Sequence, residues 1–201
     1  MSALPQLRYT LEEYYALELA SDARYEYWDG HVFELSGGSP EHETITGNIF
    51  AHLRGVLRGR EWRAFLSNLR IKVPAYLPYR YADVSALCGP PVYENIGGIN
   101  ALTNPSLIVE VLSPSTEAFD RGDKLSYYKS IESFREYVLV AQKRPHVTQL
   151  IRQANGDWLQ REVNTLTAVI HLETMGCALP LAEVYQDIAF APAQPPFPVI
   201  V

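Results

Sequence analysis

The stretch Pro105-Ser-Leu-Ile-Val-Glu110-Val-Leu-Ser-Pro114 is the most strand-like run of the chain, and it carries a carboxylate in its middle. Residues 107–112 form a short run bounded by prolines, which is the pattern of a central strand buried on both faces. An ionised Glu110 is unfavourable there unless a cation, hydrogen bonds or water receive it. Glu110 is therefore half of a structural ion pair, the end of a strand that reaches solvent, or part of a functional cleft.

Length and composition favour a single domain. With 201 residues and 47% hydrophobic content the chain can bury one sizeable core. We therefore predict one domain over residues 1–190 and a proline-rich tail at 191–201. The net charge of −6 gives no overall basic footprint, so any affinity for nucleic acid has to come from a local patch or a bound metal.

The cysteines and the hydropathy pattern bear on the compartment. Cys88 and Cys177 form neither a CxxC pair nor a disulfide framework, which fits the reducing cytosol and gives no structural zinc site. No apolar stretch approaches the roughly 18 residues of a membrane span, and the first residues lack the pattern of a signal peptide. We expect a cytoplasmic protein without membrane association.

Two local signals near the N-terminus predict a helix and a hairpin. Thr10 and Glu13 have the spacing of a capping box, which predicts a helix over residues 11–20. Aromatic and β-branched residues then flank Asp29-Gly30, which predicts a β-hairpin over residues 24–36. Glu26 falls on the first strand of this hairpin.

The segment before the central strand contains two further residues of interest. We expect a helix at 40–60, two short strands or one bulged strand at 62–66 and 69–73, a strand at 81–87, and a surface loop at 88–104. His42 lies three residues before Ile45 and shares the inward face of the helix. Asp83 lies near the beginning of its strand.

The segment after the central strand predicts a βαβ unit and a second hairpin. The expected elements are a helix at 120–132 with Asp120 as N-cap, a strand at 135–141, and hairpin strands at 146–152 and 158–163. The strand, helix, strand order implies that residues 107–112 and 135–141 are parallel neighbours. Asn155-Gly156 has the signature of a type I′ turn.

Lys124 is placed on the face of the predicted helix that must pack on the sheet, together with Tyr127, Tyr128 and Ile131. A lysine alone there could be a stem that snorkels to solvent. However, Glu26, Asp83, Glu110 and Lys124 each lie on an element otherwise built to be buried. Several such exceptions in one small domain suggest a shared cleft.

Three carboxylates and a lysine have a definite chemical use. Carboxylates a few ångströms apart hold Mg²⁺ or Mn²⁺ through hard oxygen ligands, and the ammonium stabilises charge on a phosphate or tunes the attacking water. The set is therefore that of a metal-dependent phosphodiesterase.

The ordered set of motifs resembles the PD-(D/E)XK nuclease superfamily and, within it, the family of putative restriction endonucleases found in cyanobacteria and other bacteria. The resemblance covers residues 11–185. The segments that carry it are Tyr25-Glu26-Tyr-Trp-Asp29-Gly30, Ser39-Pro40-Glu41-His42, Tyr81-Ala82-Asp83-Val84-Ser85, Val109-Glu110-Val111-Leu112-Ser113-Pro114-Ser115-Thr116, and Asp120-Arg-Gly-Asp123-Lys124-Leu-Ser-Tyr-Tyr128-Lys129.

The resemblance implies a restriction-endonuclease-like α/β fold, with a mixed central sheet flanked by helices, and a role for each site residue. Asp83 and Glu110 would be the metal-binding acids, helped by the Val111 carbonyl. Glu26 would complete the site, bound to the metal directly or through water, and Lys124 would be the catalytic lysine.

Two departures from the superfamily pattern are visible. Ala82 replaces a proline that only shapes the backbone, and Leu112 occupies the position of the lysine in the (D/E)XK element. In this family pattern the lysine has moved to the following helix, where Lys124 meets the expectation. Catalysis therefore depends on whether Lys124 reaches the cleft.

Two other residues invite weaker interpretations. His42-Glu43-Thr-Ile-Thr46 begins like a zinc-protease motif, but Thr46 stands where the second histidine is needed. A single histidine of this kind is more often a structural residue, or one that supports the metal ligands, than a ligand itself. We interpret His42 in this way. Tyr128 could hold Lys124, although packing with its hydroxyl at the cleft rim is the interpretation we favour.

The leading hypothesis is a Mg²⁺- or Mn²⁺-dependent endonuclease that hydrolyses DNA phosphodiester bonds, and the alternative is a nuclease-fold binding or assembly module without turnover. The acidic net charge favours the alternative. The retained buried charges favour the enzyme, because they destabilise a fold that does not use them. A double-strand cutter must address two strands, so we also expect a homodimer.

Overall fold

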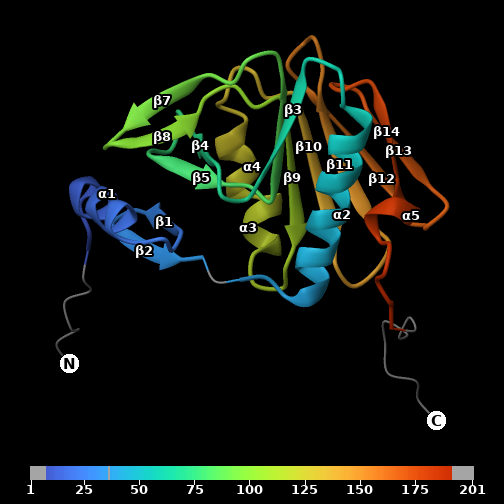
Figure 1. Cartoon of the computed structure of the whole chain (residues 1–201), viewed down its shortest axis with the longest axis horizontal. Helices are drawn as coiled ribbons and strands as arrows, with labels where there is room; N and C mark the ends of the chain where they lie inside the picture. The colour runs from blue at the N-terminus through green and yellow to red at the C-terminus, as the bar shows by residue number, and fades with distance from the viewer. Residues whose placement is uncertain (1–7, 36, 192–201) are drawn as a thin grey trace.

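Six strands form a mixed central sheet in the computed structural model, which describes residues 8–35 and 37–191. The strand order is β12 (Trp158–Val163), β11 (Val147–Arg152), β10 (Glu136–Ala141), β9 (Leu107–Leu112), β6 (Val84–Cys88) and β3 (Trp62–Leu66) (Figure 1). Only β9 and β10 are parallel, and the other neighbours are antiparallel. The predicted central strand and its parallel neighbour are therefore confirmed.

Strand β9 is buried along its whole length, and its side chains alternate between two cores. Leu107, Val109 and Val111 point into one core. Ile108 and Leu112 point into the other. By this alternation Glu110 belongs to the second face of the sheet, which is the face that the helices following β9 cover.

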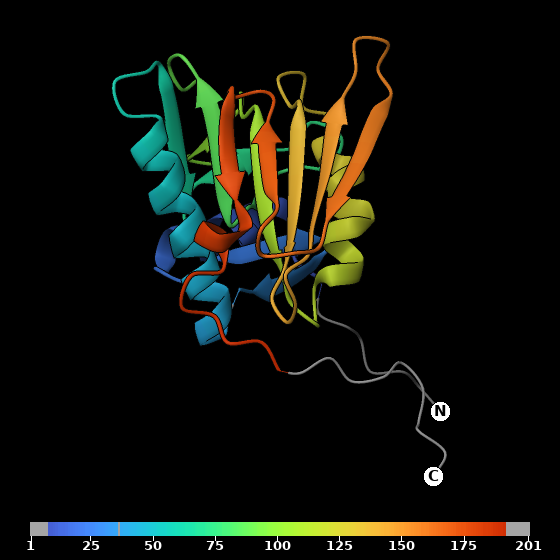
Figure 2. The same ribbon diagram turned by 90° about the vertical axis from the view of Figure 1, so that its right-hand side faces the viewer.

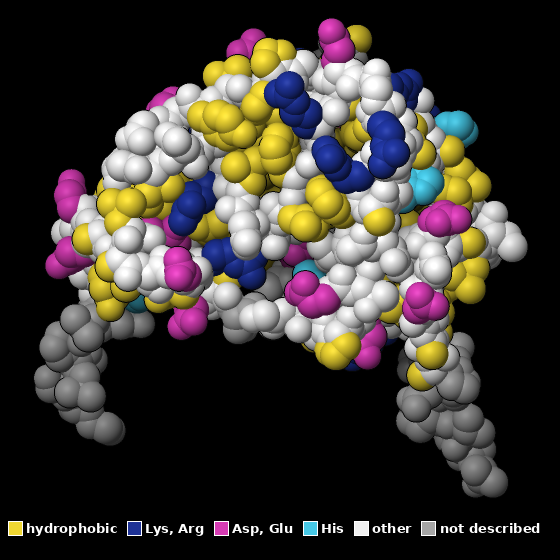
Figure 3. Space-filling model, viewed as in Figure 1, with side chains coloured by type: hydrophobic (Ala, Val, Ile, Leu, Met, Phe, Trp, Pro, Cys, Tyr) yellow, Lys and Arg dark blue, Asp and Glu magenta, His cyan; other side chains and the backbone are white. Residues whose placement is uncertain are grey.

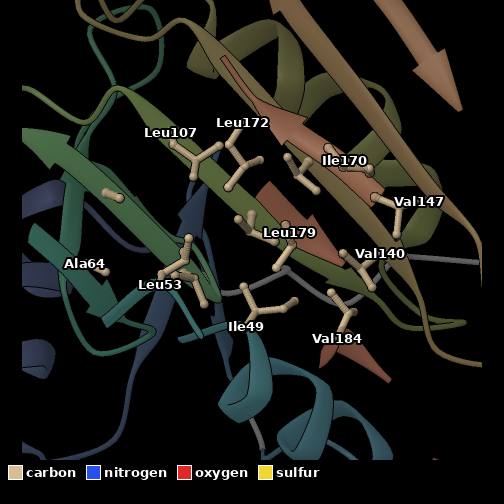
Figure 4. Close-up of a cluster of buried hydrophobic side chains, with 14 of the residues drawn as sticks. Ile49, Leu53, Ala64, Leu107, Val140, Val147, Ile170, Leu172, Leu179 and Val184 are labelled. Atoms are coloured by element: carbon tan, nitrogen blue, oxygen red, sulfur yellow. The ribbon is translucent and has the colours of Figure 1, made fainter. Parts of the chain in front are cut away.

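The first face of the sheet is covered by a long helix and a C-terminal hairpin. These elements are α2 (Pro40–Val56), β13 (Val169–Leu172), β14 (Cys177–Pro180) and α5 (Leu181–Val184). Ile49 and Leu53 of α2 pack there against Val140, Leu179 and other apolar side chains of the sheet and hairpin (Figure 4). α2 begins at the end of the sheet where β9 finishes (Figure 1).

The second face is covered by two short helices, α3 (Glu117–Arg121) and α4 (Asp123–Tyr128), on the opposite side of the sheet from α2 (Figure 2). Tyr128 and Phe134 pack there against Tyr137 and the rest of the second core. α4 is thereby held over the strand that carries Glu110.

A second layer of structure lies beside the central sheet. It contains α1 (Leu11–Ala20), the hairpin β1 (Tyr25–Trp28) and β2 (His31–Glu34), and a four-stranded sheet in the order β5 (Tyr79–Tyr81), β4 (Arg70–Lys72), β8 (Ile99–Leu102) and β7 (Tyr93–Ile96). Its core includes Tyr14, Tyr79 and Tyr81. Tyr79 and Tyr81 also hydrogen-bond the buried Glu18 carboxylate, which Arg70 neutralises at 2.7 Å.

Local signals placed the N-terminal elements correctly. The capping box of Thr10 and Glu13 is present, and the helix runs over Leu11–Ala20 as predicted. Asp29 and Gly30 both have positive φ, at 43° and 84°. This is the requirement of a type I′ turn, so the first predicted hairpin is confirmed.

Residues 88–104 were predicted as a loop, and that prediction is wrong. β7 and β8 pair there as a hairpin around Gly97-Gly98. Leu102 lies opposite Ile71 of the distant strand β4. The hairpin is therefore stabilised by a tertiary partner that the local pattern of prolines and glycines does not reveal.

Other predictions need smaller corrections. The helix expected at 120–132 is divided at Gly122, whose φ of −109° and ψ of −102° are not helical, and Asp120 lies inside α3 rather than at an N-cap. Gly156 is the one residue with positive φ among 153–157, so the second hairpin has no type I′ turn. Of the two alternatives for residues 62–73, the two separate strands are present: β3 lies in the central sheet and β4 in the second sheet.

No helix in the described ranges is long and apolar enough to cross a membrane. The predicted proline-rich tail lies, from residue 192 onward, outside the described residues.

Candidate functional site

Asp83 lies at the bend where the chain leaves the second sheet and enters the central one, between β5 and β6. Its position follows from strand register, because Val84 pairs with Val109 and the next residue pair outward is Asp83 and Glu110. The Val111 N–H donates to Asp83 Oδ2 at 2.7 Å, and the Asp83 N–H donates to Glu110 Oε2 at 3.4 Å. The Asp83 carboxylate is thus held by the backbone of Val111, and the Glu110 carboxylate by the backbone of Asp83.

Glu110 is almost completely buried, and its charge is met by side chains from α4. Lys124 Nζ lies 2.9 Å from Glu110 Oε1. The Tyr128 hydroxyl donates to the same oxygen at 3.1 Å and approaches the Tyr81 carbonyl at 3.3 Å. Burial raises the pKa of Glu110 above its ordinary value, although Lys124 opposes this shift.

Lys124 is only 8% exposed and lies among acids from several elements. Besides Glu110, its Nζ lies 3.3 Å from Asp120 Oδ1 of the preceding helix. Burial alone lowers the pKa of a lysine, but the nearby carboxylates of Glu110, Asp120 and Glu26 outweigh it and raise the pKa of Lys124. Lys124 is therefore a protonated ammonium at neutral pH.

His42 contributes from the first turn of α2. The helix is capped by Ser39, whose hydroxyl accepts from the His42 N–H at 3.2 Å. The ring Nε2 lies 3.2 Å from Asp83 Oδ2, and only 15% of the side chain is exposed. Burial lowers the pKa of His42, but the Asp83 carboxylate outweighs it, and the net shift is upward.

Glu26 lies on β1, on the strand face turned toward β5. Its Oε1 accepts from the Tyr81 N–H at 3.3 Å. Its charge contributes to the raised pKa of both Lys124 and Tyr128. It is therefore near the other acids electrostatically, but within the described residues it forms no hydrogen bond or ion pair with Asp83, Glu110 or Lys124.

A buried arginine joins the hairpin of Glu26 to the helix of Lys124. Arg80 of β5 is 0% exposed, and its guanidinium lies 5.4–6.0 Å from the ring centres of three aromatic side chains. These rings belong to Trp28 of β1, Tyr76 of the loop before β5, and Tyr127 of α4. Cation–π contacts in such a desolvated cluster are worth up to about 2 kcal/mol each, so the cluster fixes β1 against α4.

The structure thus brings three of the predicted residues together: Lys124 pairs with Glu110, and Asp83 and Glu110 are joined through the Asp83 and Val111 N–H groups. The sequence interpretation missed the part of Asp120, although its spacing of four residues from Lys124 on a helix was a usable signal. The sequence interpretation also favoured a packing role for Tyr128. Its ring does pack in the core, and its hydroxyl also donates to Glu110.

A comparison with protein families decides the relationship. The family model described as "Uma2: Putative restriction endonuclease" matches residues 11–182. The chain belongs to the Uma2 family. The resemblance inferred from the motifs is therefore confirmed.

Relatives of this Uma2 chain agree with that assignment. The uncharacterized protein slr1290 of Synechocystis sp. is 30% identical over 89% of this chain and 92% of its own length. The uncharacterized protein sll1609 of the same organism is 30% identical over 83% of this chain and 93% of its own length.

A solved structure shares the fold. The crystal structure of a "putative nuclease belonging to DUF820" from Anabaena variabilis matches with a TM-score of 0.67 and 20% identity. The match covers 87% of this chain and 96% of the other. The restriction-endonuclease-like α/β fold expected from the sequence is confirmed.

The oxygen atoms of this Uma2 site suit a hard divalent cation. Within residues 8–35 and 37–191 no group of three or more His, Cys, Asp or Glu side chains is arranged to hold a metal ion. Mg²⁺, however, keeps several waters and is usually bound by one or two carboxylates together with substrate phosphates. The adjacent Asp83 and Glu110 carboxylates match that smaller requirement.

The site side chains, Asp83, Glu110, Lys124 and His42, gather at one end of the sheet. β9 ends there, and β6 and α2 begin there (Figure 1). The space-filling view shows the surface hollowed at this lower edge, between the N-terminal hairpin and α2, with charged side chains on its rim (Figure 3). Asp83 and His42 retain 18% and 15% side-chain exposure, so the site is partly open to solvent.

His146, in the turn that follows β10 at the same end, provides a test of the local electrostatics. Burial and the Arg144 and Arg121 guanidinium groups lower its pKa below the ordinary value of 6.5, and Glu162 and Glu117 partly oppose them. In the pH window just below 6.5 the unfolded chain then binds more protons at this site, so stability rises with pH there.

We expect Arg144→Ala to move the pKa of His146 back toward 6.5 and to flatten this part of the stability profile. An NMR titration of the imidazole ring protons measures the first effect, and thermal melts over the same pH range measure the second. An unchanged His146 pKa in Arg144→Ala would mean that burial and Arg121 cause the shift without Arg144.

Proposed function

We propose that this Uma2 protein is a metal-dependent endonuclease that hydrolyses DNA phosphodiester bonds. The observation that carries the proposal is the buried Lys124–Glu110 pair in contact with Asp83 at the hollowed end of the sheet. A structural domain gains little from such a group, because buried ion pairs are often no more stable than apolar replacements.

The chain's own residues divide the work by charge and position. Asp83, Glu110 and the Val111 carbonyl would hold Mg²⁺ or Mn²⁺. When bound, the cation polarises the phosphate and lowers the pKa of water. Asp83 is kept in place by the Val111 N–H, and the Glu110 side chain is kept in place by Lys124 and Tyr128.

Lys124 acts in this proposal as a charged donor rather than as a base. Its raised pKa keeps the proton on Nζ, so the ammonium is suited to stabilise negative charge that grows on a phosphate in the transition state. Asp120 positions this ammonium from the adjoining helix.

Glu26 and His42 take supporting parts. Glu26 is anchored by the Tyr81 N–H at the second sheet, and we propose that it completes the metal site directly or through water. His42 orients Asp83 through the 3.2 Å contact of Nε2 with Oδ2.

Cleavage of supercoiled plasmid tests the proposal. The parent protein with Mg²⁺ or Mn²⁺ should yield nicked or linear DNA, whereas Glu110→Gln should not, since it keeps an acceptor for Tyr128 but loses the charge. Product that is equally abundant with Glu110→Gln would come from a contaminating nuclease and would remove the basis for the site.

The net charge of −6 favours a second candidate, a nuclease-fold binding module without turnover. Calorimetric titration with Mn²⁺ separates the two candidates. Heat of binding that disappears in Asp83→Asn supports the enzyme, and no binding at millimolar metal supports the module.

A further inference from the structure

A hollow of about 230 Å³ lies at the carboxyl ends of the two parallel strands β9 and β10. The residues that line it are Leu112, Pro114, Glu117, Ala141, Gln142, Lys143 and Arg144. Leu112 and Ala141 are the last residues of these two strands, so the hollow lies at this edge of the sheet.

The hollow adjoins the candidate site along β9. Leu112 lies on the same face of β9 as Glu110 and is two residues beyond it, which is about 7 Å along a strand. Register places Ala141 directly beside Leu112. On the other side the Ser39 hydroxyl donates to Gln142 Oε1 at 3.2 Å, and this joins the wall of the hollow to the helix that carries His42.

The wall of the hollow is positively charged, in contrast to the chain as a whole. Lys143 and Arg144 are exposed, and neither forms an ion pair within the part of the chain that the structure describes. The one acid of the lining, Glu117, is neutralised by Arg121 at 2.9 Å. Two uncompensated cations therefore face solvent next to Leu112.

A second hollow, of about 160 Å³, lacks this character. It lies between β12 and β13, and its arginine, Arg161, is already paired with Glu173 at 2.6 Å. Of the two hollows, the one beside the Asp83–Glu110 site is therefore the one with unpaired cationic side chains, Lys143 and Arg144.

We propose that the hollow with Lys143 and Arg144 is a phosphate subsite that holds the DNA backbone next to the phosphodiester placed at Glu110. The proposal rests on the proposed nuclease function. Because the hollow begins at Leu112, two residues along β9 from Glu110, the subsite would hold a phosphate of the same DNA backbone near the reacting one. Arg144 is suited to bidentate contact and Lys143 to a single charged contact.

Fluorescence anisotropy with a short labelled DNA duplex, in buffer with a chelator so that nothing is cleaved, tests the subsite. The affinity of the full-length parent is measured over a range of salt concentrations, together with Lys143→Ala and Arg144→Ala. Each variant should weaken binding and reduce the slope of log K against log salt by about 0.7–0.9.

Arg58→Ala and Lys129→Ala are matched controls. Arg58 lies beyond the far end of α2, about 24 Å from His42 at 1.5 Å per residue, and Lys129 lies over the Trp158 ring. Both controls should keep the salt slope of the parent.

The outcomes separate the subsite from the nuclease. If Lys143→Ala and Arg144→Ala both keep the salt slope of the parent, the proposed subsite is wrong. It is also wrong if the parent binds no DNA. If the slope falls as expected but plasmid is not cut with metal, the subsite stands and the proposed hydrolysis fails. If plasmid is cut while both variants keep the parent slope, the hydrolysis stands and the subsite fails.

Discussion

Lys124→Met is expected to lower the rate of DNA cleavage by a factor on the order of one hundred or more, the scale of losing one electrostatic stabiliser of the transition state. The same change should lower stability, because Glu110 and Asp120 lose the ammonium at 2.9 and 3.3 Å. Removing one partner of a buried pair typically destabilises by about 3–5 kcal/mol. Cleavage is therefore measured at a temperature where circular dichroism shows a folded variant.

Lys129→Met is the matched control for this prediction. Lys129 directly follows α4, but its ammonium lies 5.3 Å from the centre of the Trp158 ring rather than beside Glu110. It should cleave like the parent. A folded Lys124→Met that cleaves like the parent, with Lys129→Met inactive, would transfer the catalytic assignment to Lys129.

The Glu110→Gln/Lys124→Met double variant distinguishes stability from catalysis. It removes both members of the pair and leaves neither Glu110 nor Lys124 as a stranded charge, so we expect it to melt higher than Lys124→Met alone. It should remain inactive. A double variant that melts lower than Lys124→Met would show that Glu110 has a stabilising partner other than Lys124.

Asp83→Asn is expected to abolish metal-dependent cleavage and the metal-dependent rise in melting temperature. Metal at one hundred times its Kd stabilises a folded protein by about 2.7 kcal/mol, and this increment should disappear when a ligand charge is lost. The asparagine oxygen can still accept from the Val111 N–H, and the charge that raises the pKa of Glu110 is removed. The metal-free variant should therefore keep its stability at pH 8.

Differential scanning fluorimetry with and without Mn²⁺ measures both quantities. Asp157→Asn, in the exposed turn between β11 and β12, is a control that should respond to metal like the parent. If Asp83→Asn loses much stability and keeps its metal response, Asp83 is a structural partner of His42 instead.

The parts of the fold that the sequence predicted are those determined by local chemistry. Prolines bound residues 107–112, and the strand occupies those residues. The capping box and the Asp29-Gly30 turn likewise act over a few residues. The β7–β8 hairpin was missed because its partner β4 is distant in sequence.

The candidate site likewise contains residues that the sequence pattern reveals and a contact that it does not. An acid on a buried strand and a lysine on a buried helix face are visible as exceptions to the hydrophobic pattern, so Glu110 and Lys124 could be singled out. The contact of His42 with Asp83 joins the start of α2 to a bend before β6. Only the packing of α2 on the sheet creates it, and the sequence gives no measure of that distance.

The burial of Glu110, Lys124 and Asp120 as one group has an evolutionary consequence. Loss of Lys124 leaves two carboxylates without their cation in the interior, and loss of both acids leaves the ammonium without an anion, whereas joint replacement of all three removes every one of these charges. Neutral drift that removes the group therefore has to pass through poorly folded intermediates. We expect descendants of this sequence to keep Lys124 together with at least one of the two acids, or to have exchanged all three residues together.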